Sequence, residues 1–260
     1  MFGFVCCIAG CSENKSEKTS EDAEDTTIVN EQSPKDTADD EDENELVENA
    51  SDDVTTPEKA EVGDYITFGT YEQDNDTTNG KEDIEWLVLE KQGDKILVIS
   101  KYALDCVYFS EENKNYKIPQ QVSDISWEDS TVRKWLNDEF VSESFYAEEA
   151  NRIPMVDVSV NTNEDYYLDE GEDTKDRLFL LSVDEVAEYF PTDEERICLA
   201  TEYVKEKVAI IGNQTVNTMW GLRTRKKGNT YVSVLWNGSF YNNSVGDVVI
   251  VRPAMWITLN

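Results

Sequence analysis

The chain has 260 residues, a formal charge of −33 and no histidine. The acidic balance argues against a partner nucleic acid, because phosphate contacts require clustered Lys and Arg. The absence of histidine excludes Ser-His-Asp and Cys-His catalysis and histidine-liganded zinc.

Residues 1–11 indicate a secretory signal. The run MFGFVCCIAG is apolar throughout, too short to span a bilayer but suited to the apolar part of an export signal. Residues 8–11 (IAGC) resemble the lipobox of bacterial lipoproteins. That resemblance implies a signal peptide with a lipobox, acylation (palmitate or a similar chain) of Cys11, and a lipid-anchored protein at the extracytoplasmic face of the cell membrane.

The basic start of an export signal is missing, since no Lys or Arg precedes the apolar run. We therefore expect the true start to lie upstream of Met1. The alternative is a buried helix or strand in which Cys6, Cys7 and Cys11 are core residues. The abrupt change to an acidic tract after Cys11 argues against it.

Residues 12–61 are predicted to form a disordered acidic tether. They contain 19 Asp or Glu, four Lys and no aromatic residue. Such a segment buries too little apolar surface to offset the entropy lost on ordering. A flexible chain of this length spans roughly 40 Å, enough to hold a domain away from lipid headgroups. A solvated spacer is the favoured role, and a tail that collects cations or binds a partner is the alternative.

Residues 62–260 contain all six Trp and all 12 Tyr. They are predicted to form a single α+β domain, with antiparallel β-hairpins at both ends and three to four helices in the middle. The first hairpins are indicated by a strand over 62–68 and by two β-rich runs over 84–89 and 95–100, which flank Gly93.

The middle of the domain carries helix signals. A capping box at Ser126 and Asp129 precedes apolar residues at helical spacing up to residue 140. A short helix is expected over 144–152. Capping boxes also predict helices from Ser182 through Tyr189 and over 192–205. Between these helices we expect strands over 155–160 and 177–181, joined by a polar loop.

The C-terminal end is rich in β signals. Strands are predicted over 231–236 and 239–241 around an Asn237-Gly238 turn of type I′, followed by a last strand over 248–257.

Several motifs stand in order along this domain: IEWLVLEKQGDKILVISKYALD, SWEDSTVRKWLNDEF, SFYAEEANRI, RLFLLSVDE, ATEY, MWGLRT and VRPAMWITLN. Together they resemble a bacterial family, the domain of unknown function 6273, over nearly all of 62–260. Where that family usually has WWLRSPG, this chain has WGLRTR, without the second Trp and the Ser-Pro-Gly turn. The closing hairpins and the RPA motif are also similar to the C-type-lectin-like fold of sulfatase-modifying enzymes.

Three arginines in the motifs, Arg133, Arg223 and Arg252, stand in largely apolar surroundings. Each is expected to meet a carboxylate or backbone carbonyls, because burying an unpaired charge costs several kcal/mol. The alternative is a bidentate grip on a ligand carboxylate or phosphate. The residues interpreted as structural parts of the motifs are Arg133, Trp135, Asn137, Arg252 and Trp256.

A ligand-contact surface is predicted from Trp220, Arg223, Trp236 and Tyr241. Aromatic faces beside polar side chains suit stacking on sugars, so a glycan, the cell wall or a protein is the expected partner. Positions in the core or in a hairpin are the alternative.

Residues 74–83 (DNDTTNGKED) have the oxygen density of a calcium loop, with Asp74 and Asp76 as candidate ligands. The run departs from the EF-hand pattern, because its glycine falls at the seventh place and no Glu stands at the twelfth. A polar connection between two strands that binds no ion is the alternative.

The leading hypothesis is a non-catalytic binding or interaction module. The resemblance also leaves open an enzyme of sulfatase-modifying ancestry, and a carboxylate hydrolase is a further alternative. Cys106 and Cys198 are the only cysteines after residue 11. We expect buried thiols, with a disulfide as the alternative outside the cytoplasm.

Overall fold

The computed structural model describes residues 55–114, 125–159, 171–211, 219–226 and 229–259. The predicted signal segment, its Cys11 and the tether up to residue 54 lie outside the described residues. Across the ranges that are described, no helix is both long and apolar enough to cross a membrane.

The folded domain begins before the predicted boundary at residue 62. Thr55 forms a β-bridge with Ile66, and its backbone N–H donates to the carbonyl of Tyr65 at 3.0 Å. A single 3-10 turn, Pro57–Lys59, leads to Ala60, which is fully buried. Residues 55–61 therefore belong to the domain rather than to the tether, because the neighbouring strand supplies backbone partners that composition does not reveal.

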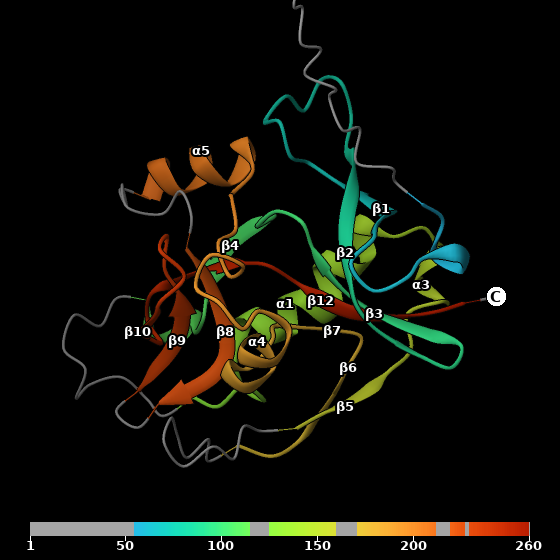
Figure 1. Cartoon of the computed structure of the whole chain (residues 1–260). Helices are drawn as coiled ribbons and strands as arrows, with labels where there is room; N and C mark the ends of the chain where they lie inside the picture. Colours follow the sequence, from blue (N-terminus) through green and yellow to red (C-terminus); the bar gives the residue numbers. More distant parts are fainter. Residues whose placement is uncertain (1–54, 115–124, 160–170, 212–218, 227–228, 260) are drawn as a thin grey trace, which may run out of the picture. The chain divides into compact units, whose positions relative to one another are not determined.

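The largest sheet is five-stranded and antiparallel throughout. Figure 1 shows its central strands running through the middle of the domain. In spatial order the strands are β1 (Tyr65–Tyr71), β2 (Glu82–Gln92), β3 (Lys95–Ser100), β12 (Ala254–Thr258) and β7 (Leu178–Phe179). The predicted hairpin around Gly93 is thereby confirmed as the β2–β3 connection, and Gly93 has the positive φ of 61° that such a turn requires.

Three smaller antiparallel sheets complete the β structure. Their strands are β8 (Trp220–Lys226), β9 (Thr230–Val234) and β10 (Phe240–Ser244); β4 (Asp105–Tyr108) and β11 (Val248–Val251); and β5 (Val156–Val158) and β6 (Thr174–Asp176).

The strand predicted over 248–257 is in fact two strands in different sheets. β11 pairs with β4, and β12 pairs with β3 and β7. The break falls at Arg252 and Pro253. Proline has no N–H to continue a ladder, and its carbonyl accepts from Ser100 N at 3.0 Å instead. Arg252 is consequently held at the junction between two sheets.

The first long helical segment comprises α1 (Thr131–Trp135), a π-helical turn (Leu136–Phe140) and α2 (Val141–Ser144). Val132, Leu136 and Phe140 are fully buried, which confirms the predicted apolar face. The predicted cap is wrong: Ser130 is the N-cap and accepts from Arg133 N at 3.2 Å. The hydroxyl of Ser126 instead closes a local turn that precedes the helix.

The remaining helices are α3 (Ala147–Ala150), α4 (Val183–Tyr189) and α5 (Glu202–Ile211). The capping box of α4 is confirmed, because Ser182 N donates to Glu185 Oε2 at 2.7 Å and Glu185 N donates to Ser182 Oγ at 3.2 Å. α4 lies in front of β8 in Figure 1.

The helix predicted over 192–205 is wrong up to residue 201, and helix begins only with α5 at Glu202. The predicted capping bonds do form: Thr192 N donates to Glu195 Oε2, and Glu195 N donates to Thr192 Oγ1. Only a turn follows them. Along 197–200 burial alternates: Cys198 is buried, whereas Leu199 is 56% exposed. That is the period of an extended chain. The described residues thus form the predicted α+β fold, a mixture of antiparallel sheets and about four helices.

Candidate functional site

Arg133 pairs with a buried carboxylate. Its Nε donates to Asp176 Oδ1 at 2.7 Å, and its Nη1 donates to the carbonyl of Glu128 at 3.0 Å. Asp176 is 1% exposed and also accepts from Trp127 Nε1 at 3.2 Å and Thr174 Oγ1 at 2.6 Å. One carboxylate therefore joins α1, the turn before it and β6.

Asn137 links the helical segment to β7. Its amide oxygen accepts from Arg177 N at 2.8 Å, and its amide nitrogen donates to the carbonyl of Leu178 at 2.9 Å. Trp135 and Trp256 are partly buried against the core. These contacts lie within the protein and are structural.

Arg223 is held by Glu185. Both terminal nitrogens of its guanidinium bond to the Glu185 carboxylate, Nη2 at 2.8 Å, and Nη1 also donates to the carbonyl of Leu180 at 2.9 Å. The side chain of Arg223 is 5% exposed. A ligand carboxylate would have to displace Glu185, which also caps α4.

Arg252 lies between two aromatic rings. Its guanidinium is 4.8 Å from the ring centroid of Trp220 and 5.3 Å from that of Phe190. Its Nε donates to the carbonyl of Ser100 at 3.0 Å, and its buried Nη1 has no hydrogen-bond partner among the described residues. Aromatic faces stabilise a desolvated guanidinium, and these two rings take the place of a carboxylate, because no ion pair of Arg252 is found among the described residues.

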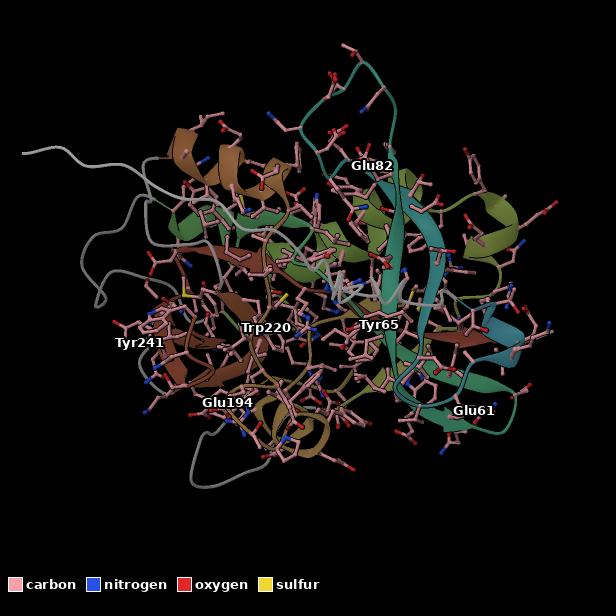
Figure 2. The ribbon with its side chains drawn as sticks, turned by 45° about the horizontal axis from the view of Figure 1, so that its top comes forward. Glu61, Tyr65, Glu82, Glu194, Trp220 and Tyr241 are labelled. Atoms are coloured by element: carbon pink, nitrogen blue, oxygen red, sulfur yellow. The ribbon has the colours of Figure 1, made fainter. Side chains whose placement is uncertain are left out.

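The four residues of the predicted contact surface do not form one surface. Trp220 is fully buried and Arg223 is 4% exposed, whereas Trp236 is 66% and Tyr241 is 54% exposed. Figure 2 shows Trp220 among packed side chains and Tyr241 at the edge of the domain. Trp220 and Arg223 are therefore interior residues, because both belong to β8, where all residues but the last are buried. Ligand contact by Trp236 and Tyr241 stays a prediction.

The turn between β9 and β10 is not the predicted type I′. Gly238 N donates to the carbonyl of Leu235 at 2.9 Å, and Leu235 N donates to the carbonyl of Ser239 at 2.8 Å. Positive φ occurs at Gly238 (82°) and not at Asn237, which is the pattern of a three-residue hairpin loop. A Cβ on Gly238 would lie 1.8 Å from the carbonyl oxygen of Asp193, so the hairpin tip packs directly on the turn that contains Asp193.

A cavity of about 570 Å³ is lined by residues from α4, the turn at 192–196 and the β8–β9–β10 sheet. The lining residues are Val183, Asp184, Ala187, Asp193, Arg196, Lys226, Val232, Ser239, Phe240 and Asn242. Successive side chains of a strand point to opposite faces. Phe240 and Asn242 therefore face the cavity, and Tyr241 between them faces away.

A second cavity, of about 510 Å³, is lined in part by Cys106, Trp135 and Lys207. Beside it, Asp105 is 1% exposed and accepts from Tyr71 Oη and Lys207 Nζ, both at 2.5 Å. Burial, and secondarily the charge of Asp105, raises the pKa of the Cys106 thiol to about 12. A thiol is nucleophilic only as its thiolate, so this raised pKa disfavours the reactive form of Cys106. Neither Cys106 nor Cys198 is in a disulfide.

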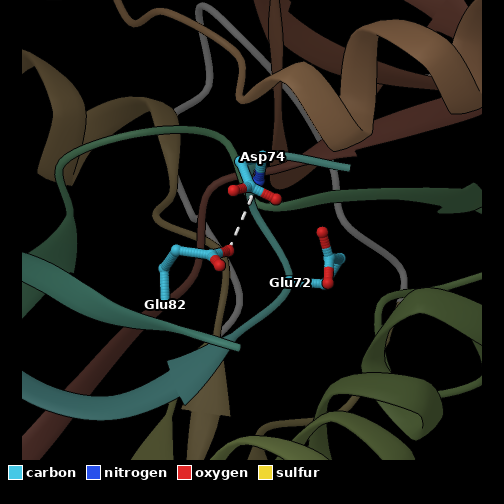
Figure 3. A group of neighbouring side chains, drawn as sticks. All are labelled: Glu72, Asp74 and Glu82. Atoms are coloured by element: carbon cyan, nitrogen blue, oxygen red, sulfur yellow. Dashed lines mark hydrogen bonds between the residues drawn. The ribbon is translucent and has the colours of Figure 1, made fainter. Parts of the chain in front are cut away.

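The predicted calcium loop gathers Asp74 with Glu72 and Glu82 rather than with Asp76 (Figure 3). Asp76 Oδ1 accepts from Thr78 N at 3.0 Å and Thr78 Oγ1 at 2.6 Å, and these bonds lower the pKa of the Asp76 carboxyl. Neither Glu72, which precedes the run 74–83, nor Glu82, which lies near its end, was among the predicted ligands. The hairpin register, in which Tyr71 pairs with Glu82, is the signal that could have found them.

A family model described as domain of unknown function (DUF6273) matches residues 93–259. The chain therefore belongs to this family. The match includes both cavities, and it leaves β1, the loop after it and all of β2 outside. No curated protein and no solved structure matches the chain.

Proposed function

We propose that the protein is a lipoprotein anchored through Cys11 at the extracytoplasmic face of the bacterial membrane. Its folded domain binds a carbohydrate, such as a cell-wall glycan, in the cavity between α4 and the β8–β9–β10 sheet. The cavity itself supports this proposal, through its volume and through the residues that line it. Its volume of about 570 Å³ lies within the range of about 300–1,000 Å³ that is typical of small-molecule sites.

The charges that line the cavity are balanced, with Asp184 and Asp193 against Arg196 and Lys226. This balance suits an uncharged polyol better than a strongly charged ligand. Arg196 is already engaged, since its Nε donates to the carbonyl of Phe190 at 2.8 Å and its guanidinium lies 4.8 Å from the Phe240 ring centroid.

The polar side chains suit sugar hydroxyls. Asn242 presents an amide that can donate and accept hydrogen bonds. The Ser239 hydroxyl already donates to Asn237 Oδ1 at 2.8 Å and can accept. Phe240 supplies an apolar surface between them. A few polar groups around apolar surface is the usual composition of a site that orients a small ligand.

Replacement of Asn242 by alanine is expected to weaken glycan binding about tenfold, since about one hydrogen bond is lost. The measurement is calorimetric titration of the full chain with peptidoglycan fragments and with hits from a glycan array. Tyr241→Ala is the matched control, because it lies next along β10 but faces away from the cavity, and it should bind normally. Loss of binding in Tyr241→Ala alone would place the site on the outer face. No binding to any glycan would refute the carbohydrate proposal, and turnover of a bound glycan would show an enzyme instead.

Replacement of Cys11 by alanine is expected to release the protein from the membrane fraction, because the acyl chains are attached to that thiol. The measurement is fractionation of the native host, combined with mass spectrometry of the mature N-terminus. Cys7→Ala is the control and should stay in the membrane fraction. Recovery of wild-type chain with an unmodified Cys11 from native membranes would contradict the anchor.

A further inference from the structure

The loop between β1 and β2 brings three carboxylates together. Glu72 follows the last residue of β1, Asp74 lies in the loop, and Glu82 is the first residue of β2. Each offers a carboxylate oxygen such that the three oxygens lie within 4.8 Å of one another. Figure 3 shows Glu72 and Glu82 on two sides of Asp74.

Two of the three carboxylates are held in position by the loop itself. Glu82 Oε2 accepts from Gln73 N at 2.6 Å and from Asp74 N at 3.3 Å. Asp74 accepts from Asp76 N at 2.8 Å and from Asn79 Nδ2 at 2.7 Å. These bonds orient the carboxylates before any ligand binds.

The third carboxylate is both buried and incompletely satisfied. Glu72 is only 9% exposed, and its buried Oε1 has no hydrogen-bond partner in the part of the chain that the structure describes. A buried charged oxygen without a partner is costly, so this arrangement is the kind that a bound cation relieves.

No Lys or Arg side chain neutralises these three carboxylates within the described residues. None of the ion pairs found there includes Glu72, Asp74 or Glu82. The nearest lysine in sequence, Lys81, is directed elsewhere. Its Nζ donates to the carbonyl of Glu143 at 2.7 Å and lies 5.8 Å from the Tyr71 ring centroid.

The geometry points to a divalent cation site formed by Glu72, Asp74 and Glu82, with calcium as its ion. All three ligands are carboxylate oxygens, which hard cations prefer. The three oxygens lie within 4.8 Å of one another, so one cation with bonds of about 2.3–2.6 Å can contact all of them. Mg²⁺ usually keeps several waters and takes only one or two carboxylates, so a set of three carboxylates suits Ca²⁺ better. Water or backbone carbonyls would complete the coordination.

A bound ion would stabilise more than the loop. The carbonyl of Gln73, between two of the ligands, accepts from Tyr203 N at 3.0 Å in the first turn of α5. Calcium at this site would therefore fix the β1–β2 connection against α5. The site lies outside the matched family region, so it is a property of this chain's own N-terminal hairpin.

The test compares thermal unfolding of the full chain in EDTA, in 10 mM CaCl₂ and in 10 mM MgCl₂. For a dissociation constant in the range of extracellular calcium modules, calcium is expected to raise Tm by about 3–10 °C. Calcium that binds exposed carboxylates equally well in the folded and the unfolded chain does not change Tm. Only calcium that binds the folded chain more tightly raises Tm, so the shift reports a folded site.

Glu72→Gln should lose this shift while its Tm in EDTA is equal to or above that of the wild type, because a buried repelling charge is removed. Asp76→Asn is the matched control: it removes the same charge outside the cluster and should keep the full shift. The proposal is overturned if Glu72→Gln keeps the shift, or if Asp76→Asn loses it equally. An equal shift with magnesium would overturn the assignment to calcium.

Discussion

Replacement of Asp176 by alanine is expected to destabilise the domain by about 3–5 kcal/mol, because it leaves the charge of Arg133 without its partner in a mostly buried place. The side chain of Arg133 is only 22% exposed and that of Asp176 is 1% exposed. The same substitution removes the acceptor for Trp127 Nε1 and Thr174 Oγ1. Urea unfolding of the full chain, followed by tryptophan fluorescence, measures the effect.

Asp157→Ala is the matched control for Asp176→Ala. Asp157 belongs to β5, which pairs with β6 in the same two-stranded sheet, and it is ion-paired with Lys175. Both of those side chains are largely exposed, at 78% and 69%. An exposed ion pair contributes only about 0–1 kcal/mol, so this variant should unfold almost as the wild type does. Equal losses in the two variants would contradict the assignment of Asp176 as a structural centre.

Replacement of Trp220 by alanine is expected to cost about 3–5 kcal/mol, the usual loss for a buried tryptophan. Trp220 is fully buried, and its Nε1 donates to the carbonyl of Arg196 at 2.9 Å. The substitution also removes one of the two rings that flank the Arg252 guanidinium. A buried cation would then face a cavity, which adds to the loss.

Trp236→Ala removes the same side chain from an exposed position, since Trp236 is 66% exposed. Its free energy of unfolding should stay within about 0.5 kcal/mol of the wild type. Chemical denaturation followed by far-ultraviolet circular dichroism avoids the loss of a fluorophore in either variant. A stable Trp220→Ala variant would show that Trp220 is not an anchor of the interior.

Only part of the candidate cation site could be predicted from the sequence. Its oxygen-rich run identified Asp74, because carboxylates close together along the chain are visible in the sequence. The same run also suggested Asp76 as a ligand, but Asp76 accepts a local hydrogen bond from Thr78 instead. Glu72 and Glu82 are ten residues apart, and only the antiparallel register of β1 and β2 places them beside Asp74.

The cavity proposed to bind carbohydrate could not be predicted from the chain order. Its wall combines Asp184 of α4, Asp193 of the following turn and Asn242 of β10, which are separated by as many as 58 positions. The predicted contact residues were three aromatic residues and Arg223, chosen because aromatic faces beside polar side chains suit stacking on sugars. Trp220 is buried beside Arg252 and the rest of a core that no short sequence window contains.

The sequence by itself determined the local elements of this protein: the apolar face that includes Val132, Leu136 and Phe140, the capping box of Ser182 and Glu185, and the β2–β3 hairpin. Each depends on contacts between residues close in the chain, where spacing alone fixes geometry. The tertiary structure decided the start of the domain near Thr55, the division of the last strand at Pro253, and the groups that meet in the cation site and the cavity. Those features depend on which distant segments pack together, and the free energy of that packing is shared across the whole core.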